Sequence, residues 1–104
     1  MSTDKEAPVL DDILKEADRL VHGPRNSDYG HPFDDYSRVS KIYNAITGQH
    51  LDASDCALLM IAVKLARIGK HHETNTIHED SLVDLAGYAW VYAQVLDVIK
   101  LDRA

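Results

Sequence analysis

The sequence predicts a single all-α domain, a bundle-like set of four helices over residues 9–104 that follows a frayed N-terminal segment, 1–8. Apolar residues recur at the three- and four-residue spacing of helices, and no stretch shows the alternation of a half-buried strand. A chain of 104 residues is long enough to bury a core without disulfides. Its single cysteine, Cys56, lies in an apolar run and is expected to pack as a small hydrophobe.

The first two predicted helices are amphipathic. Residues 9–22 carry an apolar stripe opposite a charged face, and Gly23-Pro24 ends this helix. The second helix is expected to begin near Pro32, because proline suits the first helical position, where its missing N–H would be unpaired anyway. Thr47-Gly48 closes it.

The third predicted helix is apolar on almost every side, which is typical of a central, buried helix. Ser54 is its expected N-cap and Gly69 its expected C′ residue. The link "KHHETNTIH" then leads to a fourth helix, from about Glu79 to Lys100, with a broad apolar face. The last two helices are expected to be antiparallel.

Charge and hydropathy exclude several classes of protein. Eleven basic and seventeen acidic residues give a net charge of −6, which argues against binding to duplex nucleic acid. The longest apolar run, 57–63, is far shorter than a membrane span of roughly 20 residues. The N-terminal "MSTDKEAP" lacks the apolar core of a signal peptide. A soluble, cytoplasmic protein is therefore expected, with no membrane partner.

Two cations interrupt the apolar third helix at positions that share one face. Lys64 and Arg67 are three residues apart, and an unpaired charge is costly in a core. If the fourth helix folds back on the third, Lys64 lies opposite Asp84, and Arg67 opposite Asp80 or Ser81. The arrangement has two readings. It is either a structural ion-pair cluster, or a site where carboxylates hold Mg²⁺ and the cations hold phosphate.

The link between the first two helices is unusually long for a helix connection and chemically rich. Arg25 could bind phosphate, Tyr29 could stack on a base, and Gly30 permits a turn before the next helix. The alternative is an ordered loop whose tyrosine covers the core. Six histidines and one cysteine show no standard zinc-ligand spacing, so a zinc site is not expected.

Three stretches carry a resemblance to a known family: "VHGPRNSDYGHPFDDYSRV", "ALLMIAVKLARI" and "DSLVDLAGYAWVYAQVL". Together they resemble a family of small, mostly phage-encoded helical proteins of uncharacterised function. They also look like distant relatives of the MazG-like, all-α nucleoside triphosphate pyrophosphohydrolases. Those enzymes hold Mg²⁺ with an E-x-x-E pattern on one helix and an E-x-x-D pattern on a later one. Asp84 before "LAGYAWVY" matches the end of the second pattern, but Ser81 replaces its glutamate and the first pattern is missing.

The resemblance implies a nucleotide site and a role for each candidate residue. Asp80 and Asp84 would bind Mg²⁺ and act in catalysis. Lys64, Arg67 and Arg25 would bind phosphates, Tyr29 would contact a base or sugar, and Tyr88 would support the site from behind.

Three functions are considered, and the first is the one we expect, because the Asp84 helix is the segment that best matches the pyrophosphohydrolases. It is Mg-dependent hydrolysis of a nucleoside triphosphate to monophosphate and pyrophosphate, in the host cytoplasm if the protein is phage-encoded. The second is a nucleotide-binding protein without hydrolysis, and the third a helical scaffold or interaction protein. A homo-oligomer, dimer or tetramer, is expected because aliphatic faces are in surplus.

Overall fold

The computed structural model describes residues 9–23 and 28–104, and within them the chain is helical with no strand. Its long helices are α1 (Val9–His22), α3 (Pro32–Thr47), α4 (Ala53–Glu73) and α5 (Glu79–Ile99). The all-α class and the order of the helices are therefore confirmed. Arg25 lies outside the described residues.

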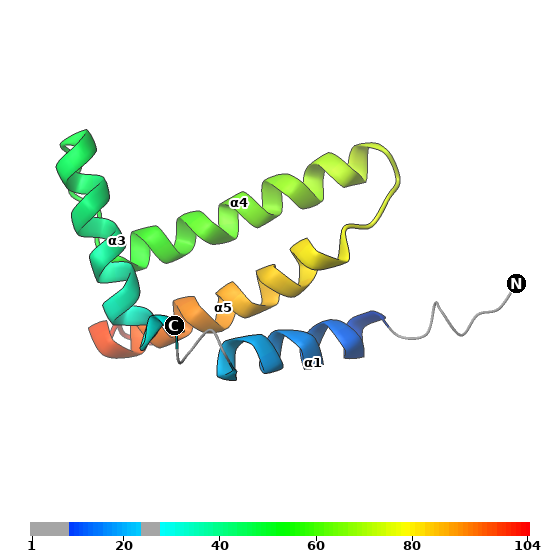
Figure 1. Ribbon diagram of the computed structural model, residues 1–104, viewed down its shortest axis with the longest axis horizontal. Helices are drawn as coiled ribbons and strands as arrows, with labels where there is room; N and C mark the ends of the chain where they lie inside the picture. The colour runs from blue at the N-terminus through cyan, green and yellow to red at the C-terminus, as the bar shows by residue number, and fades with distance from the viewer. Residues whose placement is uncertain (1–8, 24–27) are drawn as a thin grey trace, which may run out of the picture.

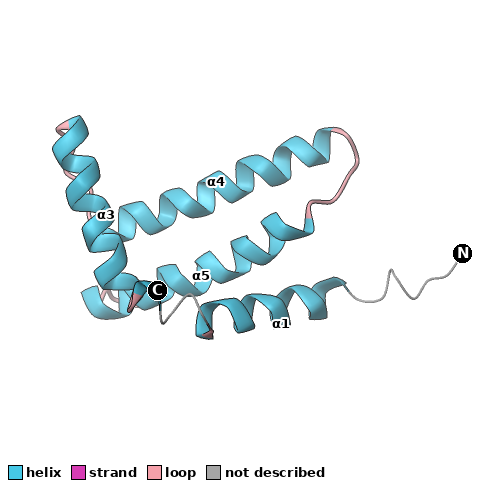
Figure 2. Cartoon of the chain, in the orientation of Figure 1, coloured by secondary structure: helices cyan, strands magenta, loops and turns pink. Residues whose placement is uncertain are grey.

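The helices are arranged around α5, which contacts each of the other three. Helices α4 and α5 form an antiparallel hairpin, α1 packs along α5 on the side away from α4, and α3 crosses one end (Figures 1 and 2). The sequence-based expectation placed the third helix at the centre. The structure shows that α5 is central instead, and that only Ala53, Cys56, Ala57 and Lys64 of α4 are buried.

The start of α4 differs by two residues from its expected cap. Asp52, not Ser54, is the N-cap, and its side chain accepts a hydrogen bond from the Asp55 backbone N–H at 2.9 Å. The Asp55 carboxylate in turn accepts from the Asp52 N–H at 2.9 Å, which completes a reciprocal capping box. Ser54 donates its hydroxyl hydrogen to Asp52 at 2.7 Å and so supports the cap rather than forming it.

The end of α4 also differs from expectation. Gly69 is not the C′ residue, because the helix continues for another turn to Glu73. The backbone N–H groups of Thr74 and Thr76 donate to the carbonyl of His71, which ends the helix in a tight turn. The predicted end of α3 was correct: Gly48 follows the helix in the left-handed region, with φ of 74°, where glycine is favoured.

Small and medium side chains make up most of the described core. Its buried apolar members are Ala17, Val21, Tyr36, Ala53, Cys56, Ala57, Val91 and Val95. Cys56 is a buried free cysteine, as expected, and burial raises the pKa of its thiol. Larger, partly buried side chains of α4 and α5, among them Met60, Tyr88 and Tyr92, pack against this cluster.

Helix α5 is long and apolar enough to span a membrane by length and composition alone. In this fold it is the helix against which all the others pack, and core helices commonly pass the same test. A single such helix is weak evidence for a membrane span.

The N-cap of α4 should make the free energy of unfolding depend on pH in the acidic range. Hydrogen bonds from the Ser54 hydroxyl and the Asp55 N–H lower the pKa of Asp52. A carboxylate with a lowered pKa stabilises the fold above its unfolded pKa of about 3.9, and that stabilisation is lost as pH falls through the folded pKa. We expect Asp52→Ala to lower the free energy of unfolding by about 1 kcal/mol at neutral pH.

The same variant tests the direction of this pH effect. In urea titrations, the difference between the wild type and Asp52→Ala should stay constant from neutral pH to about pH 5 and shrink below about pH 4. Asp97→Ala, at an exposed site on α5, is the control and should cost less at every pH. A difference that grew on acidification would contradict the prediction.

Candidate functional site

A buried ion pair joins α4 to α5. The Lys64 Nζ atom lies 2.9 Å from Oδ2 of Asp84, and the two side chains are 10% and 38% exposed. This is the pairing that the spacing of charges predicted. The lysine is thus held in a nearly dry environment while one edge of its carboxylate partner reaches solvent.

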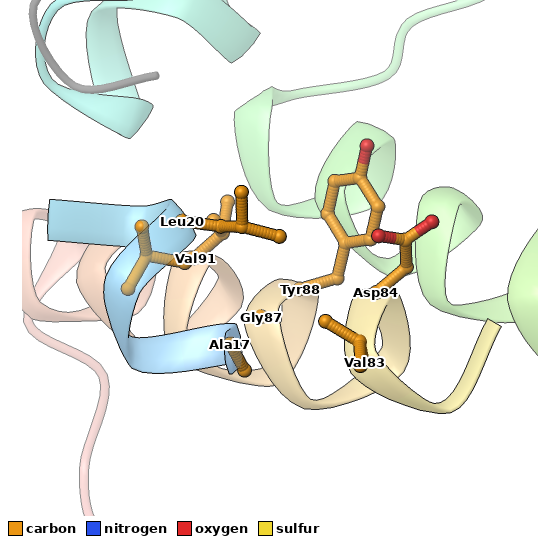
Figure 3. A pocket seen from close by; sticks show the side chains of 8 residues that line it. Ala17, Leu20, Val83, Asp84, Gly87, Tyr88 and Val91 are labelled. Carbon is orange, nitrogen blue, oxygen red and sulfur yellow. The ribbon is translucent and has the colours of Figure 1, made fainter. Parts of the chain in front are cut away.

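Tyr88 lies beside this pair, one helical turn after Asp84. The Lys64 Nζ atom is 5.9 Å from the centre of the Tyr88 ring, at the outer limit of a cation–π contact. Figure 3 shows the side chains of Asp84 and Tyr88 projecting from α5 toward α4. Lys64, Asp84 and Tyr88 therefore form one cluster at the α4–α5 contact.

The second half of the predicted charge cluster does not form. Arg67 and Asp80 are both exposed, and the ion pairs among the described residues do not join them. Ser81, the alternative partner of Arg67, is buried at 1% exposure and its Oγ atom contacts Nδ1 of His78 at 2.6 Å. Lys64 and Asp84 thus meet inside the fold, whereas Arg67 and Asp80 lie on its surface.

A small cavity of about 30 Å³ opens next to the Asp84–Tyr88 edge, between α1 and α5. Its lining residues are Ala17, Leu20, Val21, Val83, Asp84, Gly87, Tyr88 and Val91, and Figure 3 shows them close up. A Cβ atom at Gly87 would lie 3.4 Å from Cγ1 of Val21, so α1 and α5 are closely packed at this point. The cavity is apolar on the α1 side and polar only at Asp84 and Tyr88.

A second, smaller cavity of about 10 Å³ lies next to the first and shares Val21 and Val91 with it. Tyr29, Gly30, Pro32, Asp35, Tyr36 and Trp90 complete its lining. Three predicted site residues, Tyr29, Asp84 and Tyr88, therefore line two neighbouring hollows. Sequence reasoning did not find Asp35 and Trp90 as lining residues. The sequence around Trp90 indicated only a core residue. Asp35 was recognisable only as an acidic residue in the first turn of α3.

A model of the family Domain of unknown function (DUF6378) matches residues 12–96, which covers every described helix almost completely. The chain belongs to the DUF6378 family. The same span contains the Lys64–Asp84 pair and all the residues that line the two cavities.

Two curated relatives of this DUF6378 chain are phage proteins. It is 38% identical over 81 residues to the Gene 55 protein of Mycobacterium phage D29, which covers 78% of this chain and 51% of that protein. It is 35% identical over 80 residues to the Gene 55 protein of Mycobacterium phage L5, which covers 76% of this chain and 49% of that one. The DUF6378 chain thus spans about half the length of these relatives, and they support the expectation of a phage-type protein. No solved structure matches it.

The acids of this DUF6378 domain do not fit the metal site that the resemblance implied. Asp84 is engaged by Lys64, and Asp80 is exposed one turn earlier. Nowhere in residues 9–23 and 28–104 do three His, Cys, Asp or Glu side chains gather as metal ligands would. A Mg²⁺ ion held by protein groups needs several oxygen ligands, even when substrate phosphates supply the rest. We therefore derive no step through a metal.

Proposed function

We propose that this chain binds a nucleotide, with its phosphate at Lys64 and its base or sugar toward Tyr29. The observation that carries the proposal is the Lys64–Asp84 pair, whose carboxylate edge is open beside Tyr88 at the mouth of a cavity. An ammonium group has three hydrogen-bond donors, and the contact with Asp84 engages one of them. Lys64 does not line the cavity itself, so a phosphate would have to reach its free donors past Asp84 and Tyr88, which do line it.

Aromatic side chains at the two cavities support this choice of ligand. Tyr88 lies next to the ion pair, and Tyr29, which is 52% exposed, lines the neighbouring hollow with Trp90. Aromatic faces of this kind stack on bases. Both hollows are far smaller than the roughly 300 Å³ of an ordinary small-molecule pocket. We therefore propose that the ligand lies across their openings rather than inside either one.

Binding without hydrolysis is the version that the described side chains favour. Arg67, exposed one turn after Lys64 on α4, would add a second phosphate contact, as would Arg25 from outside the described residues. Asp80 and Asp84 do not fit a Mg²⁺ site as their side chains lie here, so no metal role is proposed for them, and a distant relationship to the MazG-like pyrophosphohydrolases remains a prediction. The proposed setting is the cytoplasm of a phage-infected cell, which contains the nucleotide pools.

Calorimetry with a panel of nucleoside and deoxynucleoside triphosphates tests this proposal. We expect micromolar binding by the wild type, weakened at least about tenfold in Lys64→Met, because a charge-assisted hydrogen bond to phosphate is lost. Lys70→Met removes an exposed lysine from the last turn of the same helix and should leave the affinity unchanged. Equal affinities for all three proteins would refute the site.

The same panel, with Mg²⁺ added, separates binding from catalysis. Ligand recovered intact after denaturation supports capture. Pyrophosphate release that disappears in a folded Asp84→Ala variant would instead establish the pyrophosphohydrolase. Neither binding nor turnover would favour the third alternative, a helical scaffold or interaction protein.

A further inference from the structure

The side of α4 that faces away from α5 is apolar and uncovered. Leu58, Ala62, Leu65 and Gly69 follow one another at alternating spacings of four and three residues, and all are exposed. The two leucines have exposed fractions of 50% and 52%. This spacing is that of a coiled-coil seam. In Figure 1, α4 forms the outer edge of the hairpin, and α5 packs only on its inner side.

Gly69 has no explanation within the single chain. It lies inside a continuous helix, where glycine is less favourable than alanine. Its φ is not positive, and a Cβ atom at this position would meet nothing within 4 Å. Neither backbone conformation nor packing in this chain requires glycine there. A glycine on an exposed apolar helix face is typical of a place where another backbone or a large side chain approaches closely.

The two ends of the seam carry groups that can pair with each other. Asp55, three residues before Leu58, lies in the acidic first turn of α4, and His72, three residues after Gly69, lies in the last turn, where Lys70 is 3.9 Å from Glu73. Both Asp55 and His72 are exposed. The seam therefore has a carboxylate at one end, an imidazole at the other and apolar residues of alternating size between, a pattern that is complementary to its own reverse.

We propose that a second copy of this chain packs on this seam, with the two α4 helices antiparallel about a two-fold axis near residues 63 and 64. In this register Leu58 lies opposite the partner's Gly69, Ala62 opposite the partner's Leu65, and Asp55 opposite the partner's His72. Each large side chain meets a small one, and each Asp55 carboxylate meets a His72 imidazole. A parallel pair would set every residue against its own copy, including Asp55 against the partner's Asp55.

This proposal is independent of nucleotide binding and is tested by oligomeric state. Sedimentation equilibrium of the wild type should give a dimer. Leu65→Glu should raise the dimer dissociation constant at least about a hundredfold, because a two-fold interface contains the change twice. Leu14→Glu changes a leucine of α1 with a similar exposed fraction, 54%, and should leave the dimer intact. Circular dichroism of both variants should show unchanged helix content.

Gly69→Ala gives a second, gentler test. The methyl group improves helix propensity in the monomer but occupies the space that the partner's Leu58 needs. We expect weaker dimerisation, by about tenfold, together with greater stability of the monomer toward urea. Tighter or unchanged association would contradict the proposed register. A wild type that is monomeric at several hundred micromolar would overturn the dimer itself.

Single-cysteine variants test the antiparallel orientation. Two copies of position 62 would lie about 5 Å apart along the helix axes, and two copies of position 72 about 25 Å apart. Ala62→Cys should therefore form disulfide-linked dimers on mild oxidation, and His72→Cys should not, with the buried Cys56 as the wild-type background. Cross-linking through position 72 would show a parallel pair. Dissociation by Ile46→Glu on α3 instead of Leu65→Glu would place the interface elsewhere, and either result rejects the proposal.

Discussion

Asp84→Ala is expected to lower the free energy of unfolding by about 2–3 kcal/mol, because it leaves the Lys64 ammonium buried without its partner. Lys64 exposes only 10% of its side chain, so water cannot replace the lost carboxylate fully. The partial exposure of Asp84 keeps the expected cost at the low end of values for buried pairs. Urea unfolding at neutral pH measures it.

Lys64→Met is expected to behave differently at the other end of the same pair. Methionine fills most of the volume of the lysine stem without a charge, and the released Asp84 carboxylate is already 38% exposed. Replacing a buried charge by an apolar group of similar size is often neutral or stabilising. We expect a change within about 1 kcal/mol, in either direction.

The exposed pair on α1 is the control for burial. Arg19 and Glu16 meet at 2.7 Å, closer than Lys64 and Asp84, but both side chains are largely in water. Glu16→Ala should therefore cost clearly less than Asp84→Ala. If it cost as much as Asp84→Ala, burial would not be what makes the α4–α5 pair important.

Nucleotide binding by the Lys64→Met variant distinguishes a structural ion pair from a phosphate site. A lysine kept only to fix the register of two helices would give a Lys64→Met variant that binds nucleotides as the wild type does. A lysine kept for phosphate would give a variant that is stable but does not bind. The second outcome would mean that the chain retains a buried charge for function, at no gain in stability.

Much of the fold was predictable because the helical patterns are long and end at clear signals. The Lys64–Asp84 contact was predictable for a related reason: a short link allows few registers, and unpaired charges in apolar helices need partners. The expected Arg67–Asp80 contact did not form because both residues lie at exposed positions toward the linked end of the hairpin, where each can be solvated. A charge at an exposed position has no need of a particular partner.

The errors came from local signals that compete. Asp52, two residues before Ser54, is an equally good N-cap residue. It is the N-cap in the structure because Asp55, at the third helical position, forms a reciprocal pair of hydrogen bonds with it. Gly69 suggested a helix end, but the His71 carbonyl and the turn that follows it set the end one turn later. The all-apolar pattern of α4 predicted burial, but only Ala53, Cys56, Ala57 and Lys64 are buried in the single chain, because an apolar pattern does not say how many neighbouring helices cover it.

Ala57 on α4 lies where helix packing leaves room only for a small side chain. Ala57 is completely buried in the cluster formed with Tyr36, Val91 and Val95. Ala57→Leu adds three carbon atoms where no space exists, and we expect it to lower the free energy of unfolding by about 2–3 kcal/mol. Ala89→Leu, at an exposed site on α5, should change it by less than about 0.5 kcal/mol. If Ala57→Leu proved as stable as Ala89→Leu in urea, α4 would be able to move away from α3 and α5 to accommodate the larger side chain. The position of Lys64, two turns along the same helix, would then not be held by the core.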